Sequence, residues 1–287
     1  MFKVDLGLLR FYRNIIPPQI TIYQRVEMQE LKVALQAAKA AGKIIMKYYC
    51  SNYEVKDKSP NNPVTTADLE ANRKIQEIIM DNFPNDGWLS EETKDSSQRL
   101  KKSRVWIIDP IDGTQEFIEG LSQFAVSIAL VECGSPIVGV LHNPATNEIF
   151  NATSDGGSFC NGVPIECIGC DDLKQASALV SRTEKRKGML ENFVPILGNL
   201  HYIGSVAYKL GKLATGVSNC YFTVQPKNEW DICAGDLIVR EAGGVVLDGN
   251  SQTINYNERN PKKPAGIFAG KPKILYGLIE HYNKLQN

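Results

Sequence analysis

The segment VWIIDPIDGTQEF, residues 105–117, ends an apolar run with two closely spaced carboxylates. Asp109 closes the run, and Asp112 follows it after Pro110 and Ile111. Two carboxylates that are held near each other repel, so the arrangement needs a cation or a shared proton. Carboxylate oxygens with no histidine nearby favour Mg²⁺ or Mn²⁺ over zinc. The segment therefore predicts a divalent-metal site.

The residues around these two aspartates favour a phosphate ester as the substrate. Pro110 fixes its own φ angle and Gly113 permits a tight turn, which together make a rigid platform for both side chains. Gly113-Thr114 leads into a predicted short helix, whose free N–H groups suit a phosphate oxygen. Carboxylates beside such a helix start predict metal-assisted hydrolysis of a phosphate ester.

Further acids lie at the ends of other predicted elements, and each has a simpler interpretation when taken alone. Asp68 suits the first turn of a helix, Glu91-Glu92 a solvated edge and Asp231 a helix cap. Competing chemistry has less support, because the chain lacks the P-loop, dinucleotide-binding, GxSxG and HExxH motifs. The single CxxC, at Cys167, lacks the second pair of a zinc ribbon, so a zinc or redox protein is the weaker alternative.

The spacing of apolar residues predicts the elements that would position these acids. Thr65 or Thr66 is expected to cap the second helix, and residues 51–64 are expected to form a loop. The predicted helices span residues 26–49, 65–83, 204–216, 230–244 and 272–285. Strands are predicted within residues 87–93, 104–109, 124–144 (a hairpin turning at Gly134-Ser135-Pro136), 147–162, 177–182, 219–224 and 245–249. Alternating helices and strands in the second half indicate a layered α/β structure.

Composition sets limits on partners and location. The 287 residues carry 32 basic and 32 acidic side chains, which gives no reason to expect a nucleic acid polymer or an anionic membrane as a partner. Apolar runs are shorter than the roughly 20 residues of a membrane-spanning helix, and scattered cysteines suggest a cytoplasmic location. Residues 1–27 are expected to be a peripheral extension, because Pro17-Pro18 interrupts any helix before Met28.

Four stretches resemble, in order and spacing, the inositol monophosphatase superfamily of Mg²⁺-dependent, lithium-sensitive phosphatases. The resemblance runs from Met28 to the C-terminus and implies an α/β fold, a five-layer αβαβα sandwich. Residues 28–155 would form an α+β domain with most metal ligands, and residues 156–287 an α/β domain that completes the site. The stretches are TTAD (65–68), LSEET (89–93), WIIDPIDGT (106–114) and WDICAGDLIVREAGG (230–244).

The resemblance also implies a set of two or three Mg²⁺ ions, with Mn²⁺ as a substitute. One ion would be held by Glu91, Asp109 and the carbonyl of Ile111. A second would be held by Asp109, Asp112 and Asp231, and a looser third would share Glu91 and Asp68 through water. Asp109 would then bridge two cations, which answers the repulsion between the paired aspartates.

In the implied mechanism, catalysis depends on Asp68, Thr114 and Glu91. The Thr114 hydroxyl, paired with Asp68, would orient and deprotonate the attacking water, while the ester oxygen leaves in line. The amides of Gly113 and Thr114 would cradle the phosphate. Ser205 and Asp231 would also contact the substrate.

Within the superfamily, the sequence is most similar to the CysQ-type 3′(2′),5′-bisphosphate nucleotidases of sulfur metabolism. Glu116-Phe117 and Lys209 match that group, and Lys209 is either a point charge for a second phosphate or a solvated helix residue. Val224 stands where inositol phosphatases carry an acid, and Arg182 is a further candidate phosphate contact. The expected substrate is the 3′-phosphate of adenosine 3′,5′-bisphosphate, and also its sulfated form.

Three alternatives stay open at this stage. The substrate could instead be inositol 1-phosphate or fructose 1,6-bisphosphate. A different class of function is a relative that binds a phosphometabolite without catalysis, although retention of Thr114 and Asp68 argues against it. In every case the expected partner is a small phosphate ester, bound by a monomer or a homodimer.

Overall fold

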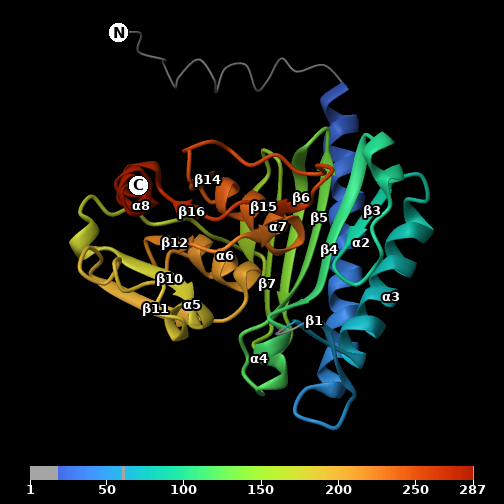
Figure 1. Ribbon diagram of the computed structural model, residues 1–287. Helices are drawn as coiled ribbons and strands as arrows, with labels where there is room; N and C mark the ends of the chain where they lie inside the picture. The colour runs from blue at the N-terminus through green and yellow to red at the C-terminus, as the bar shows by residue number, and fades with distance from the viewer. Residues whose placement is uncertain (1–18, 60–61, 287) are drawn as a thin grey trace.

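Apolar residues alternate between the two faces of strand β4 (Arg104–Asp112), and this alternation divides the molecule into layers. Val105 and Ile107 face one buried cluster, whereas Trp106 and Ile108 face another. The computed structural model describes residues 19–59 and 62–286, with side-chain surroundings for residues 29–56 and 63–286. Helices lie on both sides of each of two stacked sheets, which gives the expected αβαβα sandwich (Figure 1).

The first sheet holds β4 near one edge and contains seven strands in the order β3-β4-β5-β6-β7-β8-β9. Only β3 and β4 are parallel, and the later strands follow one another as antiparallel hairpins. The sheet extends past residue 155 to Pro164. Its other strands are β3 (Gly87–Ser90), β5 (Ala125–Glu132), β6 (Ser135–Asn143), β7 (Glu148–Thr153), β8 (Gly157–Cys160) and β9 (Val163–Pro164).

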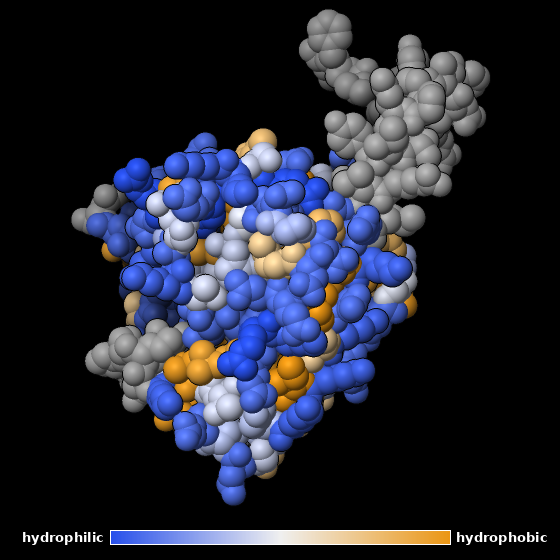
Figure 2. Space-filling model, turned by 90° about the vertical axis from the view of Figure 1, so that its right-hand side faces the viewer, coloured by the Kyte–Doolittle hydropathy of each residue, from blue (hydrophilic) through white to orange (hydrophobic). Residues whose placement is uncertain are grey.

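Two long helices, α2 (Gln19–Tyr48) and α3 (Thr66–Asn82), cover the outer face of this sheet (Figure 1). Thr65 is the N-cap of α3, as one of the two expected alternatives. The first helix starts at Gln19, upstream of the predicted start, because a proline pair is tolerated immediately before a helix. Residues 1–18 of the predicted extension lie outside the described residues. The surface on this side is mainly hydrophilic, with small apolar patches (Figure 2).

The middle layer consists of α6 (Val206–Ala214) and α7 (Glu229–Glu241), packed between the two sheets (Figure 1). Helix α7 lies directly on β6 at Gly139, where an added Cβ would approach the carbonyl oxygen of Ala234 to 2.7 Å. This close approach brings the start of α7 to the end of β4, which carries the paired aspartates.

The second sheet has the order β11-β10-β12-β16-β14, and its outer face packs on helix α8 (Pro272–Gln286). Strands β11 and β16 and helix α5 (Arg182–Arg186) were not predicted, because each has only four or five residues, too few to show a periodic pattern. The strands are β10 (Ser177–Ser181), β11 (Asn199–Ile203), β12 (Cys220–Thr223), β14 (Val245–Asp248) and β16 (Ile267–Gly270).

The predicted loop at residues 51–64 was wrong in part, because it contains strand β1 (Val55–Ser59) and most of the antiparallel strand β2 (Asn62–Thr65). Lysine, asparagine and proline are depleted in strands, so the composition did not indicate this hairpin. No helix in the described part of the chain combines the length and apolar character needed to cross a membrane. The remaining elements are α4 (Thr114–Ile118), β13 (Lys227–Asn228), β15 (Lys262–Lys263) and the short 3-10 helices at Ser97–Lys101 and Leu173–Gln175.

Candidate metal centre and active site

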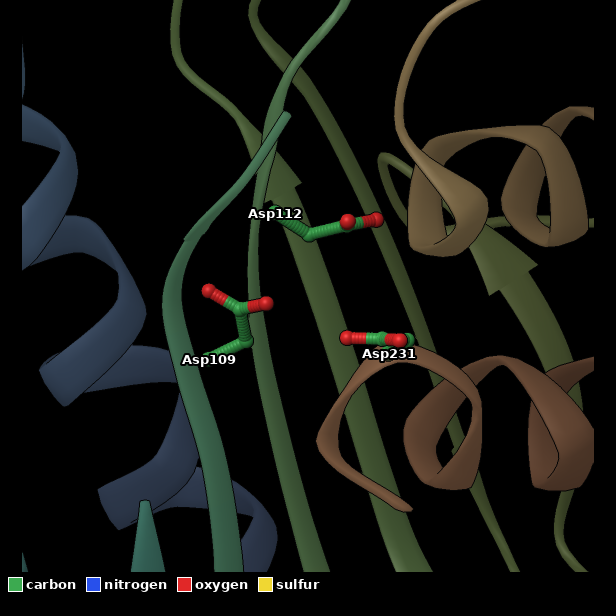
Figure 3. Close-up of side chains that lie close together, drawn as sticks. All are labelled: Asp109, Asp112 and Asp231. Carbon is green, nitrogen blue, oxygen red and sulfur yellow. The ribbon is translucent and has the colours of Figure 1, made fainter. Parts of the chain in front are cut away.

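Three aspartates from two elements point into one space between the two halves of the chain. Asp109 and Asp112 come from the end of β4, and Asp231 comes from the first turn of α7 (Figure 3). One carboxylate oxygen from each lies within 4.8 Å of the others. Residues far apart in the sequence therefore meet as the metal-site prediction requires.

A local irregularity in β4 turns both of its aspartates toward this space. Asp109 pairs with Ser127 and Asp112 with Ala125, so the register between β4 and β5 shifts between them. Pro110, which cannot donate a ladder hydrogen bond, lies within the shift. A bulge of this kind redirects side chains that would otherwise alternate across the sheet.

The electrostatics of Asp109 explain why the cluster needs a cation. Burial raises its pKa well above the ordinary value, and the charges of Glu91, Asp112 and Asp231 raise it further. Burial also raises the pKa of Asp231 to about 8, although Lys227 partly offsets the effect. A divalent cation with oxygen ligands would remove this repulsion, so the residues present fit such an ion.

Asp112 is held by the second half of the chain. Its Oδ2 accepts hydrogen bonds from the Ser205 hydroxyl and from the Ala207 N–H group, both at 2.6 Å. Ser205 is also the N-cap of α6, and its backbone has a φ of 54°. Burial raises the pKa of Asp112, and these two hydrogen bonds together with the charge of Lys209 oppose the rise. The start of α6 thus fixes one carboxylate of the cluster.

Two hydrogen bonds hold Asp231 and the residue before it in place. Its Oδ2 accepts a 2.8 Å hydrogen bond from the backbone N–H of Asn228, as part of a capping box. The adjacent carbonyl of Trp230 accepts a 3.0 Å hydrogen bond from Ser127 on β5. Asp231 is thus the third helical residue of a capping box whose N-cap is Asn228, and it also belongs to the three-aspartate cluster.

Asp68 and Thr114 form a second polar group beside the cluster. The Thr114 hydroxyl lies 3.2 Å from Asp68 Oδ1 and 3.0 Å from the carbonyl oxygen of Ile111. Asp68 Oδ2 accepts from the hydroxyl and the N–H of Thr65, at 2.5 and 2.8 Å. Burial raises the pKa of Asp68 to about 6, despite these hydrogen bonds. A carboxylate with this pKa can accept a proton near neutral pH.

Glu91 begins the segment after β3 and lies beside Asp109. Its N–H donates to the carbonyl oxygen of Ile108 at 3.1 Å, and its charge contributes to the raised pKa of Asp109. The segment is braced by Asn72, which accepts from Ser90 Oγ at 2.7 Å and donates to Thr93 Oγ1 at 3.0 Å. Glu91 is thus adjacent to the three-aspartate cluster, and its negative charge raises the pKa of one member, Asp109.

Three predicted substrate residues lie around the start of α6. Gly113 has a φ of 97°, and a side chain there would meet the carbonyl oxygen of Gln123 at 2.8 Å. Lys209 is not the solvated residue of the simpler interpretation, because it is 2% exposed and donates to the carbonyls of Ile203 and Ser205. Arg182 is paired with Glu116 of α4 and with Glu119, the C-cap of that helix: its Nη1 lies 3.0 Å from Glu119 Oε2 and 3.4 Å from Glu116 Oε1.

The role of Glu184, which is 1% exposed, could not be recognised from the sequence. One of its carboxylate oxygens accepts from Thr223 Oγ1 at 2.6 Å and from the N–H groups of Val224 and Gln225 at 2.9 and 3.1 Å. It therefore anchors the chain that leaves β12 toward α7. Its contact partners are about 40 positions away, so neither periodicity nor a local motif could have identified them.

Comparisons with known proteins agree with this geometry. The model of the inositol monophosphatase family matches residues 27–286. A "Nus factor SuhB" of Pasteurella multocida is 35% identical over 266 residues, covering 89% of this chain and 95% of that protein. An inositol monophosphatase of Mesembryanthemum crystallinum is 32% identical, covering 89% and 96%. The 3′(2′),5′-bisphosphate nucleotidase CysQ of Haemophilus influenzae is 30% identical, covering 92% and 100%.

Solved structures show the same fold. The suhB protein of Bartonella henselae superposes with a TM-score of 0.77 at 29% identity, covering 88% of this chain and 98% of that one. An inositol monophosphatase of Thermotoga maritima gives 0.76 at 28% identity, covering 91% and 97%. CysQ is thus one relative among several of similar identity. The chain belongs to the inositol monophosphatase family of metal-dependent phosphomonoesterases.

Proposed function

We propose that this protein is a Mg²⁺-dependent phosphatase that removes the 3′-phosphate of adenosine 3′,5′-bisphosphate. The observation that carries the reaction type is the buried carboxylate of Asp109 among three further acids, whose mutual repulsion a divalent cation would relieve. Within the proposal, Glu91, Asp109 and the Ile111 carbonyl would hold one ion. Asp109, Asp112 and Asp231 would hold the second, and Glu91 and Asp68 the third.

When bound, these ions supply Lewis-acid polarisation of the phosphate and lower the pKa of a coordinated water. The chain itself provides the route for the proton. The Thr114 hydroxyl hydrogen-bonds to Asp68 Oδ1, so it can take a proton from water as it passes its own to the carboxylate. The raised pKa of Asp68, about 6, matches this task at neutral pH. The amides of Gly113 and Thr114 are proposed to bind the phosphate.

The substrate proposal depends on residues around the start of α6. Arg182 and Ser205 are proposed to favour a substrate with a second phosphate, Arg182 through its positive charge. Lys209 is proposed to contribute only as a buried charge behind them, because its ammonium group donates to the carbonyls of Ile203 and Ser205. Val224 supports the same choice, because this position has no carboxylate for the hydroxyls of inositol.

Inositol 1-phosphate is the second candidate substrate, because one relative at 32% identity carries the name inositol monophosphatase. Other relatives carry a factor name rather than an enzyme name, so the comparisons give no support to the expectation that nucleic acid partners are absent. Adenosine 3′,5′-bisphosphate, inositol 1-phosphate, fructose 1,6-bisphosphate and NADP⁺ should therefore be compared at one Mg²⁺ concentration. The proposal predicts the highest kcat/KM for the first of them. Preference for inositol 1-phosphate would overturn the substrate, and phosphate release from none would indicate a binding protein.

A further inference from the structure

Glu229, the first residue of α7, is a fully buried carboxylate outside the aspartate cluster and two positions before Asp231. It accepts hydrogen bonds from the backbone N–H groups of Asn257 at 2.7 Å and Glu258 at 3.1 Å. Lys263 Nζ lies 2.9 Å from its Oε1. The N–H of Glu229 donates to a carbonyl of the same loop, that of Pro261, at 2.8 Å. The loop over residues 257–263 is therefore attached to the start of α7.

Arg99 attaches the same loop to the first half of the chain. It lies in the 3-10 helix that follows the Glu91 segment, and it is 3% exposed. Its Nε and Nη2 bind the two carboxylate oxygens of Asp95, at 2.8 and 3.0 Å. Nη1 donates to Asn257 Oδ1 at 2.7 Å, and Nη2 donates to the carbonyl oxygen of Glu258 at 2.9 Å. One guanidinium thus spans the segment of Glu91 and the loop on Glu229.

A buried ion pair contributes little net stability compared with apolar packing of the same volume, so these contacts matter chiefly for geometry. The planar fork of arginine suits this role, because it holds several acceptors in fixed directions at once. We propose that Arg99 is a positioning residue for the metal centre. It holds the loop over residues 257–263 against Glu229 and thereby fixes Asp231 relative to Glu91 and Asp109. This inference rests on the proposed metal site.

Arg104 provides a matched control in the same half of the chain. Its guanidinium also pairs with two carboxylates, Glu30 at 2.8 Å and Asp86 at 3.1 Å. Both partners belong to the first half, so Arg104 makes no such bridge to α7. Substitution of either arginine removes a partly or fully buried ion pair, but only Arg99→Met interrupts the connection to Asp231.

The test is isothermal titration of the full-length protein with Mg²⁺ in the absence of substrate, together with thermal melting. Arg99→Met and Glu229→Gln should each weaken Mg²⁺ binding about tenfold, as loss of outer-shell partners does. The Mg²⁺ affinity of Arg104→Met should stay within about twofold of that of the parent protein, even if this substitution lowers the Tm as much as Arg99→Met does. The double variant Arg99→Met/Glu229→Gln should bind Mg²⁺ no more weakly than Arg99→Met alone, because both substitutions interrupt the same connection.

Arg99→Lys keeps the charge without the fork and covers the case in which Arg99→Met does not fold. It should weaken Mg²⁺ binding several-fold at a near-parent Tm. If a folded Arg99 variant bound Mg²⁺ as tightly as Arg104→Met does, the inference about Arg99 would be overturned and the proposed metal site would stand. A parent protein that binds no Mg²⁺ would overturn the proposed metal site, and the inference with it.

Discussion

The Ser205 hydroxyl donates a 2.6 Å hydrogen bond to Asp112 Oδ2, and this contact joins the two halves of the molecule at the metal centre. Asp112 ends a strand of the first sheet, whereas Ser205 starts the helix that leads back toward the second sheet. The serine has a φ of 54°, an uncommon backbone angle for a residue with a side chain. The strain indicates that this turn is held in place by its contacts.

Ser205→Gly should weaken Mg²⁺ binding about tenfold, because it removes one of the two donors that hold Asp112 Oδ2 at 2.6 Å. Glycine tolerates the positive φ, so the variant should keep its fold. Ser205→Ala removes the same hydroxyl but keeps the strain, and should therefore melt below Ser205→Gly. Calorimetric titration and melting curves measure both effects. An unchanged Mg²⁺ affinity in Ser205→Gly would show that the hydroxyl does not position Asp112.

Thr114→Val should reduce kcat by about 10²- to 10⁴-fold, because it removes the hydroxyl that connects water to Asp68. Thr114→Ser retains the hydroxyl and should keep most of the activity. Mg²⁺ binding should persist in both variants, since neither loses a carboxylate. Steady-state phosphate release at saturating substrate and Mg²⁺ distinguishes them. Equal kcat values for the two variants would argue against a proton route through this side chain.

Without metal, the stability should fall as pH rises. Burial raises the folded-state pKa from 3.8 to about 6 for Asp68 and to about 8 for Asp231. A carboxyl with a raised pKa binds its proton more tightly when folded, so its stabilising effect is present below pH 4 and is lost as pH rises through the folded pKa. Asp231→Asn removes the larger of these two effects. In EDTA, its Tm should exceed that of the parent by more at pH 8 than at pH 5.

Saturating Mg²⁺ should reverse the order of the two proteins at pH 8, because metal stabilises only a folded state that binds it. Melting curves with and without Mg²⁺ provide this measurement. A constant Tm difference from pH 5 to pH 8 in EDTA would contradict the raised pKa of Asp231.

Arg182→Met should lower kcat/KM for adenosine 3′,5′-bisphosphate about tenfold and leave that for inositol 1-phosphate nearly unchanged. The reason is that the guanidinium can exchange Glu119, at 3.0 Å and partly exposed, for a second phosphate. Arg186→Met is the control, because Arg186 lies on the same helix and reaches Glu119 only at 3.8 Å. An equal loss with both substrates would assign Arg182 a structural role.

Much of the site could be predicted from the sequence, because the proposed metal ligands directly follow patterns that predict a strand or the start of a helix. The apolar run before Asp109 predicts a buried strand, and Pro110 and Gly113 mark the turn that follows it. Thr65 and Trp230 similarly mark the starts of the helices that carry Asp68 and Asp231. In each case the periodic pattern and the functional residue are neighbours in the chain.

Residues whose partners are remote could not be placed in this way. In the sequence Lys209 resembles any other helical lysine, yet the turn before α6 supplies the two carbonyl oxygens to which its ammonium group donates. Glu184 and Glu229 accept hydrogen bonds from loop amides that lie about 40 and 28 positions away in the chain. The β1–β2 hairpin has the composition of a loop, so tertiary context decides its conformation.

The most direct test of the account is Mg²⁺-dependent phosphate release by Asp109→Asn. Asparagine retains the shape of the side chain and removes the charge that the metal site requires, while it also relieves the buried repulsion. The account predicts no phosphate release from adenosine 3′,5′-bisphosphate or inositol 1-phosphate above the metal-free level. It also predicts that Asp109→Asn in EDTA has a Tm at or above that of the parent. Parent-level, Mg²⁺-dependent turnover by Asp109→Asn would contradict the account.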